Sequence, residues 1–144
     1  METAVGVVDV KSSPVYFHVQ RNSTYSLANT TIPFEIEQLN VGGGMNITSG
    51  IFTAPKSGIY FFSFTGLKTV AANNIWVFFY HNSNHITGAH APNVSGALTV
   101  TLSSTLSLKS GDRISLLLYA GQLHDDNVAR YTNFNGLLLQ EEMF

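Results

Sequence analysis

The sequence contains no cysteine, which excludes a disulfide framework, cysteine-ligated zinc, iron–sulfur clusters and a thiol nucleophile. The absence does not fix the compartment, because a well-packed domain can be secreted without disulfides. Charged residues are also scarce, at 11% of the chain, and seven basic against nine acidic residues leave a formal net charge of −2. This balance excludes proteins that bind by neutralising nucleic-acid phosphates or through a polybasic contact with an anionic membrane.

The chain also lacks any apolar run of about 18 residues, so no segment is expected to span a membrane. Its first residues have no basic region, and Asp9 interrupts their apolar stretch, so we expect no signal peptide there. Catalytic signatures are missing as well: there is no G-x-S-x-G, no H-E-x-x-H and no phosphate-binding glycine loop with its lysine. Gly42–Gly44 is interpreted as a turn. We therefore expect a protein that is not an enzyme and has no catalytic residues.

What the sequence does contain is enough apolar surface for one domain. Of 144 residues, 44% are hydrophobic and 12% aromatic, which is incompatible with disorder. Residues 1–13 are weakly patterned and are interpreted as an N-terminal leader or tail, and residues 14–144 as the domain. Four N-x-Ser/Thr sequons favour a secreted protein, although a surface rich in Asn, Ser and Thr explains them nearly as well. They begin at Asn22, Asn29, Asn46 and Asn93.

Alternating apolar and polar residues predict strands along nearly the whole domain. The predicted strands cover residues 15–20, 34–39, 51–54, 59–65, 75–80, 97–103, 113–119 and 134–140. The clearest alternation places Leu98, Val100 and Leu102 toward the core, and Ser104 and Thr105 are expected to shift its phase. Residues 81–95 and 122–133 are interpreted as polar loops. The pattern indicates about eight to ten strands and an all-β fold, an antiparallel sandwich or jelly roll. We interpret it as a ten-stranded antiparallel jelly-roll sandwich.

Two sets of residues resemble the globular-head domain of the C1q family, within the wider C1q/TNF-like jelly rolls. The spacing of the family's aromatic signature is matched by Phe34, Asn40, Phe52, Gly58, Tyr60, Phe62 and Phe64. Met45 stands where the family has an aromatic residue or leucine. The closing F-x-G-F-L-L motif is matched by Phe134 and Gly136, with Leu137 in place of phenylalanine. The resemblance extends over residues 14–142.

This resemblance implies a secreted, compact homotrimer without enzymatic activity that recognises ligands. Many stand-alone members resemble lectins or pattern-recognition proteins of innate immunity, so glycans or microbial surface ligands are the expected partners. The alternative is a TNF-like trimer that binds a protein receptor, or a structural trimerisation head. Apolar residues on both faces of several strands point to a buried subunit contact. The candidates for the trimer axis are Val15, Phe17, Phe61, Phe79 and Leu117.

The candidate ligand-binding residues are polar or aromatic and lie at or near predicted loop ends. They are Tyr80, His81, Asn82, His85, His124, Arg130 and Tyr131. Arg130 beside Tyr131 suits an acidic sugar such as sialic acid, because a guanidinium pairs with a carboxylate through two parallel hydrogen bonds. A surface arginine without a partner is the competing interpretation.

Calcium is the only cofactor that the residues suggest. Asp125 and Asp126 offer the hard oxygen ligands that calcium prefers, but two adjacent carboxylates need further ligands from other loops or subunits. The competing interpretation is a solvated loop. His81, His85 and His90 are not interpreted as a metal site, since a four-residue spacing aligns side chains on a helix and not on a strand.

Overall fold

The computed structural model describes residues 13–69 and 74–142, and these residues form eleven β-strands and no helix. The predicted leader, residues 1–13, lies outside this range apart from Ser13. None of the described segments is a helix able to cross a membrane. The strands are β2 (Tyr16–Gln20), β3 (Thr30–Thr31), β4 (Ile36–Val41), β5 (Met45–Asn46), β6 (Ile51–Thr53), β7 (Gly58–Lys68), β8 (Ile75–His81), β9 (Asn84–Ala91), β10 (Leu98–Leu108), β11 (Arg113–Ala120) and β12 (Asn133–Glu141).

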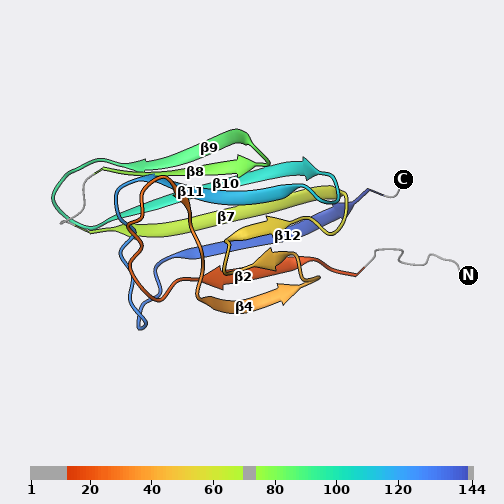
Figure 1. Ribbon diagram of the computed structural model, residues 1–144, viewed down its shortest axis with the longest axis horizontal. Helices are drawn as coiled ribbons and strands as arrows, with labels where there is room; N and C mark the ends of the chain where they lie inside the picture. The colour runs from red at the N-terminus through yellow and green to blue at the C-terminus, as the bar shows by residue number, and fades with distance from the viewer. Residues whose placement is uncertain (1–12, 70–73, 143–144) are drawn as a thin grey trace, which may run out of the picture.

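The strands form two sheets in which every pairing is antiparallel. The first sheet has the order β10-β7-β12-β2-β4. The second has the order β5-β6-β11-β8-β9, with β3 paired to β11 outside this path. Long strands of both sheets run along the long axis of the molecule (Figure 1). The predicted all-β antiparallel sandwich is therefore confirmed.

The core lies between the sheets and follows the period-two alternation of the strands. In β7, Tyr60, Phe62 and Phe64 are at most 1% exposed, whereas the residues between them point outward and are only half-buried. The ring of Phe62 lies at the centre, within 6.3 Å of five other aromatic rings. The sequence suggested that β7 and β8 would be buried on both faces. Within one chain, each is fully buried on its inward face only.

Two residues of the family-like signature have clear structural roles. Gly136 is buried where β12 passes under Phe17, and a Cβ atom there would lie 2.4 Å from Cε2 of that ring and 2.8 Å from Cδ1 of Phe62. Only glycine allows this close approach. Asn40 donates from Nδ2 to the carbonyl of Met45 at 2.8 Å and accepts the N–H of Met45 at 3.3 Å. Met45 itself is buried, as expected of a flexible apolar filler.

Three predictions about the strands were wrong. Residues 84–91 form strand β9, where a polar loop was predicted, because this segment pairs with β8 in an antiparallel hairpin. β4 begins two residues later than predicted, at Ile36. β10 continues without a shift of phase, since Ser104 pairs with Phe62 in the same unbroken register as the residues before and after it.

Three of the five candidates for the trimer axis lie in the core of a single chain. Val15, Phe17 and Phe79 are 2%, 3% and 0% exposed. Phe17 and Phe79 occupy inward positions of β2 and β8, and Val15, directly before β2, is buried in the same core. Phe61 and Leu117 do point outward and are half-buried. They belong to different sheets, however, and therefore lie on opposite faces of the sandwich.

Candidate ligand-binding site

The structure divides the predicted site residues between the two ends of the sandwich. Tyr80 and His81 end β8, and Asn82 lies in the turn between β8 and β9. Residues 121–132, here called the end loop, follow β11 beside the opposite end of β8, where Trp76 pairs with Ala120. Figure 1 shows this loop in blue at the left of the molecule. Seven residues of strand separate the two groups by about 20 Å, so they do not form one site.

At the hairpin end, the polar groups of His81 and Asn82 make hydrogen bonds within the chain. Nε2 of His81 lies 2.8 Å from Oδ2 of Asp112. Asn82 has a φ of 55°, donates from Nδ2 to Oδ1 of Asp112 at 3.3 Å, and accepts the N–H of Arg113 at 2.8 Å. These bonds tie the β8–β9 turn to the start of β11 and stabilise the hairpin.

The pKa of Asp112 is below its ordinary value, chiefly because the N–H of Lys109 donates to the carboxylate, with further bonds from His81 and Asn82. A lowered folded-state pKa adds stability at neutral pH that disappears as the pH falls through the acidic range. We expect Asp112→Asn to be less stable than the wild type at pH 7 by up to about 1 kcal/mol. The difference should shrink below about pH 4. Urea denaturation at several pH values measures it, and a difference that grows on acidification would contradict this role.

Tyr80 and His85 lie instead on the outward face of the second sheet, where they join other aromatic rings. We call this set the ring face; it comprises Trp76, Phe78, Tyr80, His85, His90 and Tyr119. Sequence reasoning did not assign a site to Trp76, Phe78, His90 or Tyr119. The period-two spacing of Trp76, Phe78 and Tyr80 was the signal that could have identified a shared face.

The end loop is organised around the carboxylate of Asp125, which is 5% exposed. Its Oδ1 accepts the backbone N–H groups of Asp126 at 2.9 Å and Tyr131 at 2.8 Å. Its Oδ2 accepts the N–H of Thr132 at 2.8 Å. Three backbone donors on one carboxylate close the loop and fix the positions of the residues between them, Val128 and Arg130 included.

Arg130 lies in this loop without a carboxylate partner among the described residues. Its φ is 54°, a left-handed conformation that residues with a Cβ rarely adopt and that the loop imposes. Nη2 makes one long bond, 3.3 Å, to Oδ1 of Asn127, and the buried Nε has no partner within the described part of the chain. Tyr131 follows it, 40% exposed, with its ring 5.9 Å from that of His124. His124, Arg130 and Tyr131 therefore come from one loop, which the carboxylate of Asp125 holds closed.

The two aspartates predicted as calcium ligands are largely committed to this loop. Oδ1 of Asp126 accepts the N–H groups of Ala129 and Val128, which hold the pKa of Asp126 below its ordinary value. Among the residues that the structure describes, no group of three or more histidine or acidic side chains could hold a metal ion. Asp125 and Asp126 do not form a calcium cage by themselves, so calcium would need further ligands from other loops or from another subunit.

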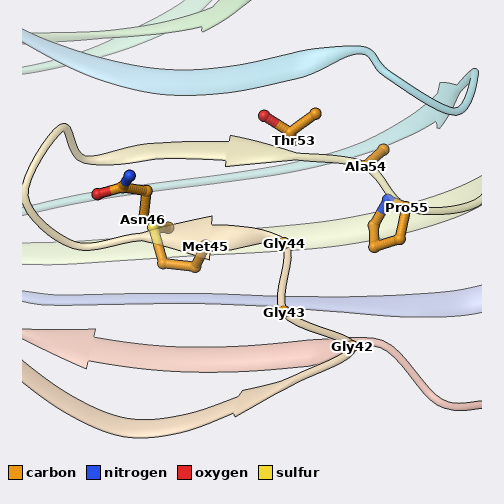
Figure 2. Close-up of a pocket in the computed structure, with 8 residues that line it drawn as sticks. All are labelled: Gly42, Gly43, Gly44, Met45, Asn46, Thr53, Ala54 and Pro55. Atoms are coloured by element: carbon orange, nitrogen blue, oxygen red, sulfur yellow. The ribbon is translucent and has the colours of Figure 1, made fainter.

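A shallow hollow of about 620 Å³ lies beside the glycine-rich connection between β4 and β5. Figure 2 shows its lining: Gly42, Gly43, Gly44, Met45, Asn46, Thr53, Ala54 and Pro55. Gly42 and Gly43 have φ values of 91° and 72°, as expected of the predicted turn. The lining offers mainly backbone and short side chains and no charged group, so we assign no ligand to it.

Comparison with known proteins gives matches over most of the chain. The model of the family described as "C1q domain" matches residues 16–139. The chain is 32% identical, over 81% of its length, to human "Complement C1q tumor necrosis factor-related protein 3", of which the match covers 48%. The mouse protein of the same name matches equally well. The chain thus spans about half the length of these curated relatives.

Solved structures have the same fold. The "Globular Domain of Zebrafish Complement 1qA protein" aligns with a TM-score of 0.74 at 19% identity, covering 89% of this chain and 99% of that one. Murine APRIL aligns with a TM-score of 0.67 at 13% identity, covering 88% of this chain and 99% of that one. At these identities the likeness concerns the fold alone.

Proposed function

Because this chain belongs to the C1q domain family, we propose that it is a secreted, homotrimeric recognition module whose end loop binds acidic glycans, sialic acid among them. Domains of the C1q and TNF-like families are non-enzymatic recognition or signalling modules. The observation that carries the proposal is the guanidinium of Arg130, which lies in a loop closed by the Asp125 carboxylate and has no carboxylate partner among the described residues.

The chemistry of the end loop supports an acidic ligand. A carboxylate on a sugar would receive charge-assisted hydrogen bonds from Arg130, and the half-exposed ring of Tyr131 beside it offers an apolar surface for the sugar ring. The carboxylates of Asp125 and Asp126 accept backbone N–H groups and form no ion pair with Arg130. Arg21 provides the contrast within the same chain, since it is buried and lies 3.5 Å from Glu35.

The outward face of the first sheet supports the trimer. Large apolar side chains are exposed there on neighbouring strands, and β7 adds the half-buried Phe61. The exposed ones are Tyr16, Leu39, Leu137 and Leu139. An apolar hollow of about 270 Å³ lies among Tyr16, Leu39 and Leu137. A surface of this kind is better buried against a second copy than left in water. If the first sheet forms the trimer contact, Phe61 remains a candidate for the trimer axis, whereas Leu117, on the second sheet, does not. Three copies of a weak site would raise the apparent affinity through avidity.

A glycan array with the purified trimer, its mass verified by light scattering, tests the proposal. It should include sialylated and other acidic sugars, with calcium and with a chelator. We expect selective binding of an acidic class, and Arg130→Gln should weaken it by at least about tenfold, because a hydrogen bond to a charged group contributes about 1.5–3 kcal/mol. Arg113→Gln is the matched control, an exposed arginine at the opposite end of β11, and should bind normally.

Each outcome of the array decides a specific point. Binding that requires calcium would make Asp125 and Asp126 ligands in the assembled trimer. A verified trimer that binds no acidic glycan would overturn the proposal. The protein-receptor alternative would then be favoured, and the 94% exposed Val128 at the tip of the end loop is the apolar contact that it would use.

A further inference from the structure

The ring face, defined above on β8, β9 and β11, is a continuous set of aromatic contacts. Trp76 stacks on His90 with ring centroids 4.0 Å apart, and it contacts Phe78 at 5.9 Å. Phe78 in turn stacks on Tyr119 at 5.1 Å and meets the edge of His85 at 4.9 Å. His85 also contacts Tyr80, at 5.7 Å.

Strand pairing explains why these rings meet. Alternate residues of β8 point inward and are fully buried, which leaves Trp76, Phe78 and Tyr80 on the outward face. Gly88 lies opposite Phe78 on β9, and a Cβ atom at that position would come within 2.9 Å of Cδ1 of the Phe78 ring. Glycine therefore allows this ring to lie over β9 and to contact His85. The rings are supported by backbone and by one another, so the surface is preorganised.

The polar atoms of these rings remain available to a ligand. The indole N–H of Trp76, the hydroxyls of Tyr80 and Tyr119 and the imidazole nitrogens make no hydrogen bond within the part of the chain that the structure describes. Trp76 is 37% exposed and Tyr119 52% exposed. The ring face thus combines exposed aromatic surface with uncommitted donors and acceptors at its edges.

Apart from the imidazoles of His85 and His90, the ring face contains no side chain that carries a charge near neutral pH: none of its residues is Asp, Glu, Lys or Arg. Ser115, Leu117 and Gly88 share it, and the nearest charged residue of the same strand face is Arg113, at the hairpin end of β11. An anionic ligand would find no lysine or arginine among the rings, and a cationic ligand no carboxylate. A second copy of the chain would find a more continuous aliphatic surface on the first sheet, around Leu137 and Leu139.

We propose that the ring face binds a neutral oligosaccharide. A pyranose ring has apolar C–H faces that pack on aromatic rings and a rim of hydroxyl groups that needs donors and acceptors at the ring edges, and this surface offers both. The Cα atoms of Trp76 and Tyr80 are separated by about 13 Å along β8, which suits a short chain of sugars and not a single one. The site is distinct from the end loop, and the inference stands whether or not Arg130 binds acidic glycans.

Trp76 is the only tryptophan of the chain, so its fluorescence reports directly on this surface. Titration with maltotetraose, cellotetraose, chitotetraose and mannotetraose should give a saturable change in emission with at least one of the four. Tyr119→Ala retains Trp76 as the fluorescent reporter. It should lower the affinity for that sugar by at least about tenfold. Trp76→Ala, measured by calorimetry because the reporter is lost, should lower the affinity to a similar extent. Tyr131→Ala removes a similarly exposed ring outside the ring face and should leave the binding unchanged.

The controls separate this inference from the proposed function. Arg130→Gln should leave neutral-sugar binding intact, and Tyr119→Ala should leave acidic-glycan binding intact. A lack of any emission change with all four sugars would overturn the inference, as would binding that survives both Trp76→Ala and Tyr119→Ala.

Discussion

Replacement of Phe62 by alanine is expected to lower the free energy of unfolding by about 3–5 kcal/mol, the usual cost of removing a buried phenylalanine ring. Phe62 is fully buried, and its ring lies between those of Phe52 and Phe79 of the second sheet, at 5.7 and 5.6 Å, and those of Phe17 and Phe134 of its own sheet. The neighbouring rings are fixed by strands and cannot close the resulting cavity. The loss would be a large part of the 5–15 kcal/mol typical of a domain.

Urea denaturation of the variant and the wild type measures this cost. Phe78→Ala is the matched control, because it removes the same ring from the half-buried outward face of β8. We expect the control to lose less than half as much stability. If Phe62→Ala and Phe78→Ala lost equal stability, burial between the two sheets would not be the main source of the domain's stability.

Replacement of Asp125 by asparagine is expected to cost about 3 kcal/mol and to abolish binding by the end loop. Both carboxylate oxygens accept backbone N–H groups, so the amide nitrogen of asparagine must face a donor in a buried position. A buried donor without an acceptor costs about 1–3 kcal/mol, and the bonds lost to the charged carboxylate add to this. Without this anchor the strained backbone of Arg130 is no longer held, and its guanidinium is no longer preorganised.

Asp126→Asn is the control for this prediction. Only Oδ1 of Asp126 accepts backbone donors, from Val128 and Ala129, and the side-chain oxygen of asparagine can do the same. We therefore expect the stability of Asp126→Asn to be close to that of the wild type. Hydrogen exchange of the amides of Tyr131 and Thr132 should rise in Asp125→Asn alone. If both variants behave alike, Asp125 does not anchor the loop.

Local sequence was sufficient to predict the all-β sandwich, because alternation of apolar and polar residues shows which side chains of a strand point toward the core. Leu98, Val100 and Leu102 alternate with threonine, and they do point inward along β10. The alternation failed where a segment has no apolar stripe of its own. Asn84–Ala91 is rich in polar and small residues, and it becomes strand β9 through its pairing with β8. β-Structure is decided by such partners more than by intrinsic propensity.

The candidate site depended still more on tertiary contacts. The sequence identified Arg130 and Tyr131 as a possible acidic-sugar site, and it placed Asp125 beside them as a possible calcium ligand. It could not reveal that the carboxylate of Asp125 is buried on three backbone N–H groups, because those donors are oriented only once the loop has closed.

The amino-acid sequence by itself therefore determined the all-β class, the absence of disulfides and the residues of the family signature. It also determined which residues point toward the core in most strands. The signature residues follow from the spacing that they share with the C1q family, and the other properties follow from composition and from a period of two along one segment. Only the tertiary structure decided that Phe17 and Phe79 lie in the core, that His81 and Arg130 lie at opposite ends, and that rings from β8, β9 and β11 form one surface. Each of these depends on which strands become neighbours, and that choice is made by long-range packing of two sheets and not by any local pattern.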